Sequence, residues 1–68
     1  MQNKNLYRAN IRQGMVVDIT LKKDQGTDRL TRGTVMRILT NKQYHSRGIK
    51  VMLTDRQVGR VQRIVEDL

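Results

Sequence analysis

Apolar and polar residues alternate over residues 15–22, which is the pattern of a β-strand with one buried face and one wet face. The apolar residues share one face: Met15, Val17, Ile19 and Leu21. The opposite face is mostly polar: Val16, Asp18, Thr20 and Lys22. We therefore expect a strand here, with its second face exposed to water.

Three further runs rich in valine and isoleucine predict strands. They cover residues 30–39, 48–53 and 58 to about 62. The end of the chain also fits helical spacing through a set of apolar residues: Val58, Val61, Ile64, Val65 and Leu68. Because Gly59 would weaken a helix at its start, we favour a strand to about Gln62, followed by a short turn or a frayed helical end.

The alternation is imperfect in the run at residues 30–39. Two apolar residues fall on each face of this run: Val35 and Leu39 on one, Met36 and Ile38 on the other. A bend or β-bulge near Arg37 would reconcile the two faces, and small barrels require strongly coiled strands.

Glycines and polar segments separate the runs. Gly14 would let the chain reverse before the first strand. Gly33, Gly48 and Gly59 lie at or in strands, where glycine marks a bend or a close backbone approach. The polar connections cover residues 23–28, 40–47 and 54–57. The second of these is the longest surface loop and the preferred place for recognition.

Together these features predict an all-β fold, a small barrel of four to five strongly bent antiparallel strands. The 68 residues suffice for one domain. We expect residues 1–10 to form a short, flexible and frayed N-terminal segment, in which Leu6 and Tyr7 could dock on the barrel. Residues 11–68 would form the barrel domain, with a small core and modest stability.

Several sequence blocks resemble the YwbE family of small bacterial proteins. The blocks are VDITLKKDQ (17–25), LTRG (30–33), ILTN (38–41), GIKV (48–51) and VGRVQ (58–62). The resemblance covers about residues 8–64 and implies no particular activity. The glycine spacing is also similar to KOW and SH3-like barrels of ribosomal and translation proteins, which implies an SH3-like or KOW-like barrel.

The chain departs from the family pattern at three places. The glycine of the first loop has moved to position 26, and a run with paired histidines is replaced by His45-Ser46-Arg47. An Asp-Gly turn is replaced by Asp55-Arg56. This last change puts a non-glycine residue where a tight hairpin favours positive φ, so we expect a wider turn.

Charge points to an anionic partner. The chain has fourteen lysines and arginines but only six acidic residues, which gives a formal net charge of +8. Such an excess favours nucleic acid, because each cation that neutralises a phosphate releases condensed counterions. The alternative is that charge only keeps a small domain soluble. The basic residues are spread along the sequence, so a binding face would have to be assembled by the fold.

Ten residues are candidates for a nucleic-acid-binding face. They are Lys22, Lys23, Arg29, Arg32, Tyr44, His45, Arg47, Lys50, Arg60 and Arg63. Arginine suits this role because its planar fork meets phosphate oxygens in pairs. An equally open interpretation is an ordinary solvated strand face, with salt bridges to neighbours such as Asp18 or Asp55.

Base stacking is expected to be a minor binding mode, because Tyr7 and Tyr44 are the two aromatic residues of the chain. Tyr44 could stack on a base or lie over the barrel rim. Shape and phosphate contacts with structured RNA suit this composition better.

The residues do not support catalysis or metal binding. His45 is the single histidine and cysteine is absent, so one chain cannot form a structural zinc site. Asp24 and Asp28 match no calcium-binding motif. No phosphate-cradling glycine loop and no nucleophile with a base and an orienting acid can be recognised. We expect no enzyme activity, no cofactor and no small-molecule substrate.

The same sequence gives no sign of a membrane association. No apolar run approaches the roughly 20 residues of a membrane span. The first residues lead into no apolar stretch, so we expect no secretory signal. The absence of cysteine fits a cytoplasmic protein.

Two functional hypotheses follow. The first is a non-catalytic RNA-binding accessory protein associated with ribosomal RNA or translation, in which lysines and arginines neutralise phosphates and the loop at residues 40–48 selects shape. The second is a protein-interaction module that docks an acidic partner protein or self-associates through Val16 and Met52, which fall on nominally polar faces.

Overall fold

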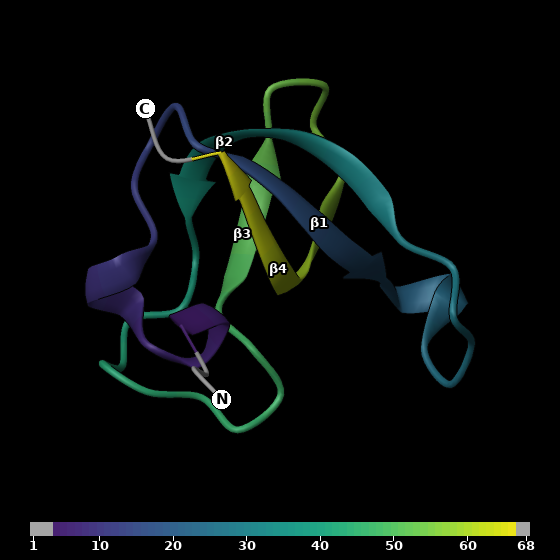
Figure 1. Cartoon of the computed structure of the whole chain (residues 1–68), viewed down its shortest axis with the longest axis horizontal. Helices are drawn as coiled ribbons and strands as arrows, with labels where there is room; N and C mark the ends of the chain where they lie inside the picture. The colour runs from purple at the N-terminus through teal and green to yellow at the C-terminus, as the bar shows by residue number, and fades with distance from the viewer. Residues whose placement is uncertain (1–3, 67–68) are drawn as a thin grey trace.

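In the computed structural model, which describes residues 4–66, four antiparallel strands pair in a closed ring, with β4 returning to β1 (Figure 1). The strands are β1 (Val16–Leu21), β2 (Thr31–Ile38), β3 (Lys50–Leu53) and β4 (Val58–Glu66). Short 3₁₀ turns are η1 (Lys4–Leu6), η2 (Arg8–Asn10) and η3 (Lys22–Asp24). The expected all-β fold of a small barrel is confirmed.

The core fills the inside of this ring with the alternate residues that the hydrophobic pattern selects. Its buried members are Ile11, Met15, Val17, Ile19, Val35, Ile49, Val51, Leu53 and Val61. In β1 the expected alternation holds on the inner face, where Val17 and Ile19 are fully buried. On the outer face Val16 and Thr20 are half-buried, but Asp18 is buried at 5% exposure, so that face is less wet than expected.

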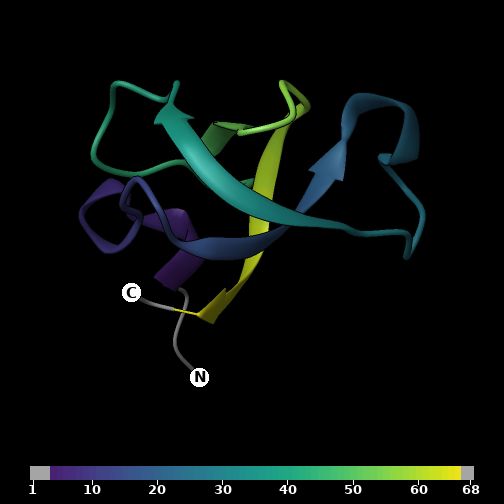
Figure 2. The same cartoon turned by 90° about the horizontal axis from the view of Figure 1, so that it is seen from above.

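β2 is strongly curved, as Figure 2 shows, and a register shift accompanies the curve. Val35 pairs with Leu53, and Arg37 pairs with Met52, the next residue of β3, so Met36 is the extra residue of a bulge. The predicted irregularity next to Arg37 is therefore confirmed. Along this curve, Thr31–Thr34 pair with β1, and the rest of β2 from Val35 onward pairs with β3.

The predicted end of the last strand is wrong. β4 continues from Val58 to Glu66, with no turn or helical end after Gln62 within the described residues. The register explains the error, because Ile19 pairs with Val61 while the preceding Asp18 pairs with Arg63. Gln62 is thus an extra residue, and it produces the spacing of three between inward-facing apolar residues that imitated a helix. Leu68, part of that helical pattern, lies outside the described residues.

The segment Lys4–Asn10 lies against the barrel, where we expected that Leu6 and Tyr7 could dock. The Asn5 side chain donates to the carbonyl of Val61 (3.0 Å), and the Asn5 carbonyl accepts from the Ile49 N–H (2.9 Å). The Leu6 carbonyl accepts from the His45 N–H (2.9 Å). These bonds fix the segment against β4 and the loop at residues 40–48. Residues 1–3 lie outside the described part of the chain.

Two turns depend on left-handed backbone. Gly14 has φ of 94°, which allows the expected reversal before β1. Between β3 and β4, Leu53 donates to Gln57 (2.8 Å) and Arg56 donates to Leu53 (2.9 Å), which defines a three-residue loop. The turn is thus wider than a two-residue hairpin, as expected, and Arg56 closes it with φ of 75°.

Among residues 4–66, none of the helical segments has the length and apolar content needed to cross a membrane.

Candidate functional site

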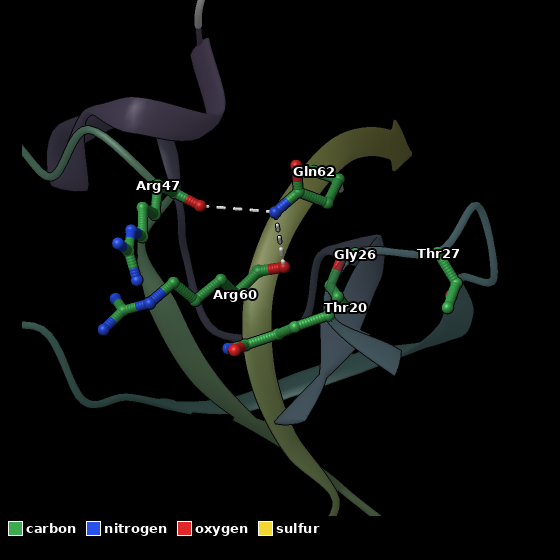
Figure 3. Close-up of a pocket in the computed structure, with 7 residues that line it drawn as sticks. Thr20, Gly26, Thr27, Arg47, Arg60 and Gln62 are labelled. Carbon is green, nitrogen blue, oxygen red and sulfur yellow. Dashed lines mark hydrogen bonds between the residues drawn. The ribbon is translucent and has the colours of Figure 1, made fainter. Parts of the chain in front are cut away.

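A shallow hollow lies on the outer surface of β1 and β4, bordered by the two long connections (Figure 3). An adjoining hollow shares three of its residues, Thr20, Gln25 and Arg60, and extends towards β3. We call the combined surface the basic groove. Its polar side chains are Thr20, Lys22, Gln25, Thr27, Arg47, Lys50, Arg60 and Gln62.

Strand pairing explains why the groove is basic. Arg60 in β4 lies opposite Thr20 in β1 and opposite Lys50 in β3, so these three residues are neighbours across three strands. Directly opposed side chains in antiparallel strands have Cβ atoms about 5 Å apart, and like charges at that spacing destabilise the sheet. An anion bound between Lys50 and Arg60 would relieve this repulsion.

Hydrogen bonds hold the two groove arginines in place. One guanidinium nitrogen of Arg60 donates to the Gly48 carbonyl (3.1 Å). The Gln62 amide donates to the carbonyls of Arg47 (3.3 Å) and Arg60 (3.4 Å). Figure 3 shows both guanidinium groups extending to the same side of β4. Both arginines therefore line the same hollow.

Carboxylates do not neutralise these charges. Within residues 4–66 the ion pair that the structure shows joins Arg32 to Asp18, and none involves Lys22, Arg47, Lys50 or Arg60. The remaining donors of these four side chains are available to a ligand.

The positive charges of the groove also affect His45. Partial burial lowers the pKa of His45 below its ordinary value, and nearby positive charges lower it further. These charges belong to Arg60, Arg47 and Lys42. The Nδ1 atom of His45 accepts a hydrogen bond from the Arg47 N–H (3.1 Å), which a neutral imidazole can do.

Four of the ten candidate residues line the groove: Lys22, Arg47, Lys50 and Arg60. Arg32 instead pairs with Asp18 through two hydrogen bonds (2.9 and 3.2 Å), as the salt-bridge interpretation anticipated. Arg63 lies opposite Asp18 on β4 and helps to lower the pKa of that carboxyl. Lys23 and Arg29 are exposed in the connection between β1 and β2 and lie outside the groove lining.

Tyr44 packs against Tyr7 rather than lying alone over the barrel rim. The two ring centroids are 5.2 Å apart with a tilt of 55° between the planes, and the two residues form an isolated β-bridge. Sequence reasoning missed this pair, because 36 residues separate Tyr7 from Tyr44 and no local pattern links them.

Sequence reasoning also missed the neutral polar members of the groove, Thr20, Gln25, Thr27 and Gln62. A signal existed for Gln62, which follows Arg60 by two positions and so falls on the same face of a strand. Gln25 reaches the groove because η3 folds the chain back over β1, which no short motif announces. In the described part of the chain, no group of three or more histidine, cysteine or acidic side chains could hold a metal ion.

The chain is thus a small, closed, four-stranded β-barrel protein with a basic groove across three of its strands. Over residues 4–64 it matches the family described as "Uncharacterized conserved protein (DUF2196)", and it belongs to that family. It is 55% identical over 58 residues to "Uncharacterized protein YwbE" of Bacillus subtilis (strain 168), a match that covers 85% of this chain and 89% of that protein. The resemblance to YwbE-like proteins is confirmed. No solved structure matches the chain.

Proposed function

We propose that this protein is a non-catalytic, cytoplasmic RNA-binding protein that holds the phosphate backbone of RNA in the basic groove. The observation that carries the proposal is the gathering of Lys22, Arg47, Lys50 and Arg60 around one surface without an acidic partner. These residues come from three separate parts of the sequence, around positions 22, 47–50 and 60, and the fold brings them to one surface.

The chemistry of the groove suits a phosphodiester chain. Arginine forks bind phosphate oxygens in pairs, and each neutralised phosphate releases counterions. The groove also carries the Thr20 hydroxyl and the amides of Gln25 and Gln62, which are neutral donors and acceptors. Such groups can bind ribose 2′-hydroxyls, which distinguish RNA from DNA.

The first RNA to test is ribosomal RNA, because the glycine spacing is similar to that of barrels in ribosomal proteins. Fluorescence anisotropy of a labelled ribosomal RNA fragment would measure binding to the wild type. We expect the double variant Arg47→Gln/Arg60→Gln to bind about tenfold more weakly or worse, because each charged hydrogen bond contributes about 1.5–3 kcal/mol.

The matched control is Arg37→Gln, which removes an exposed arginine of β2 that lies outside the groove lining. Because Arg60 also binds the Gly48 carbonyl, circular dichroism must show that the double variant is folded. Equal weakening by the control and the double variant would refute the groove as the binding site. Competition by polyglutamate as effective as that by RNA would favour an acidic protein partner instead.

A further inference from the structure

Tyr7 and Tyr44 form the most exposed large apolar contact on the described surface. Each residue is 47% exposed, although the ring centroids are only 5.2 Å apart. Because about half of each residue remains accessible, ring surface is open to a ligand. The chain has no phenylalanine or tryptophan, so its two tyrosine rings both lie at this surface site and not in the core.

Backbone bonds hold the pair at a fixed place. Tyr7 and Tyr44 form an isolated β-bridge, and their neighbours extend it. The Arg8 N–H donates to the Gln43 carbonyl (2.8 Å), and the His45 N–H donates to the Leu6 carbonyl (2.9 Å). The rings are therefore supported on both sides by pairing between the N-terminal segment and the loop at residues 40–48.

The pair lies within reach of the basic groove. Tyr44 and Arg47 are three residues apart, so their Cα atoms are separated by about 11 Å at most. That is the length of about three stacked nucleotides of one strand. A cation also accompanies the rings, because Arg8 is held beside the same loop by a hydrogen bond from Nε to the Thr40 carbonyl (2.9 Å).

We propose that the Tyr7–Tyr44 pair is a stacking platform for an unpaired base of an RNA strand whose phosphates occupy the basic groove. This inference rests on the proposed function and specifies its ligand as RNA with a single-stranded segment. It revises the expectation that stacking is a minor mode, because the fold brings the two aromatic residues together. A paired duplex keeps its bases stacked inside and offers none to the rings.

Intrinsic tyrosine fluorescence tests the platform directly, because Tyr7 and Tyr44 are the two tyrosines of the chain and tryptophan is absent. A short single-stranded RNA titrated into the wild type is expected to quench this fluorescence. Anisotropy of a labelled copy of the same RNA measures binding in parallel. Binding without quenching would overturn the platform while leaving the proposed function intact. Binding of the ribosomal RNA fragment but not of the single strand would also overturn the platform alone, whereas no binding of either RNA would refute both.

Variants of Tyr44 separate stacking from bulk. Tyr44→Leu is expected to weaken binding of the single strand about fivefold or more, since stacking on an aromatic ring contributes at least about 1 kcal/mol per base. Tyr44→Phe keeps the ring and is expected to bind as the wild type does. Both variants are expected to bind a duplex as the wild type does. Equal affinity of Tyr44→Leu and wild type for the single strand, with both proteins folded, would overturn the inference.

Discussion

Asp18 is buried on the outer face of β1 because Arg32 covers it. The Asp18 carboxylate accepts two hydrogen bonds from the Arg32 guanidinium, at 2.9 and 3.2 Å. This hydrogen bonding lowers the pKa of Asp18 below its ordinary value of 3.8, against burial, which raises it, and the charges of Arg32 and Arg63 lower it further. Arg32 is thus committed to the fold and is a poor candidate for binding phosphate.

The lowered pKa of Asp18 fixes the sign of a pH effect. The carboxylate contributes stability that is complete above its unfolded pKa, near 3.8, and is lost as the pH falls through the lower folded pKa. We expect Asp18→Asn to lower the free energy of unfolding by about 1–2 kcal/mol at pH 7. As the pH falls, the stability of this variant should decline less than that of the wild type. Urea denaturation at a series of pH values measures both effects.

The matched control for this experiment is Asp28→Asn, which removes an exposed carboxylate from the connection between β1 and β2. We expect it to have little effect on stability at pH 7. Asp55 keeps its own contribution in both variants, because bonds from Gln57 lower the pKa of Asp55. A pH profile of Asp18→Asn identical to that of the wild type would contradict the role of the pair.

Arg56 adopts an unfavourable backbone conformation that closes the turn between β3 and β4. Its φ of 75° lies in the left-handed region, which costs a residue with a side chain about 1–2 kcal/mol. We expect Arg56→Gly to raise the stability by about 0.5–1 kcal/mol, after the greater chain entropy of unfolded glycine is subtracted. Thermal denaturation measures the gain. Arg56→Ala keeps a Cβ atom, so a similar gain in that variant would show that charge and not backbone strain is responsible.

Close contact between β1 and β4 requires glycine at position 59. A Cβ atom there would collide with the Thr20 carbonyl and lie 2.9 Å from Cδ1 of Ile19. At Gly33 the obstacle is the far end of the Leu53 side chain, which can rotate. We expect Gly59→Ala to lower the free energy of unfolding by about 1–3 kcal/mol and Gly33→Ala to lower it by less. Urea midpoints that show the reverse order would contradict this account.

The hydrophobic pattern predicted the strands well where alternation was regular and poorly where a bulge interrupted it. β1 followed its pattern closely, whereas β4 ran four residues beyond the predicted end. The cause is the extra residue Gln62, which shifts Ile64 to the inner side of the barrel. A bulge changes the apolar period locally from two to three, and a single sequence does not distinguish that spacing from a helical turn.

The candidate site was predicted by residue type but not by grouping. Arg60 and Lys50 meet because β3 and β4 pair in one particular register, which depends on the three-residue turn between them. Arg32 looked equivalent in the sequence, but the register of β1 and β2 places it opposite Asp18. Composition therefore indicated a basic face, and strand register determined which cations form it.

If the protein binds RNA through phosphates, its affinity for RNA should depend strongly on salt concentration. If all four groove cations contact phosphates, the logarithm of the association constant should fall against the logarithm of salt concentration with a slope of about −3 for single-stranded RNA. Removing two of them in Arg47→Gln/Arg60→Gln should reduce the slope to about −1.5. Titrations at several salt concentrations check this. A slope near zero in the wild type would contradict the phosphate mechanism.

The size of the molecule sets the length of RNA for these experiments. Its principal extents are 26, 24 and 22 Å. At 3.4 Å per stacked nucleotide of one strand, the longest extent corresponds to about eight nucleotides. An oligonucleotide of about that length would fill one molecule without leaving room for a second.

Closure of the barrel restricts how any partner can be recognised. Since β4 pairs with both β3 and β1, and β2 pairs with both β1 and β3, none of the strands within residues 4–66 is a free edge along its whole length. An incoming polypeptide therefore finds no strand with one whole edge open for main-chain hydrogen bonds, which is a common way for β-domains to capture peptides. The same closure protects the native state from edge-to-edge aggregation. Recognition by this protein therefore depends mainly on side chains, so its specificity can change by point substitution while the barrel stays the same.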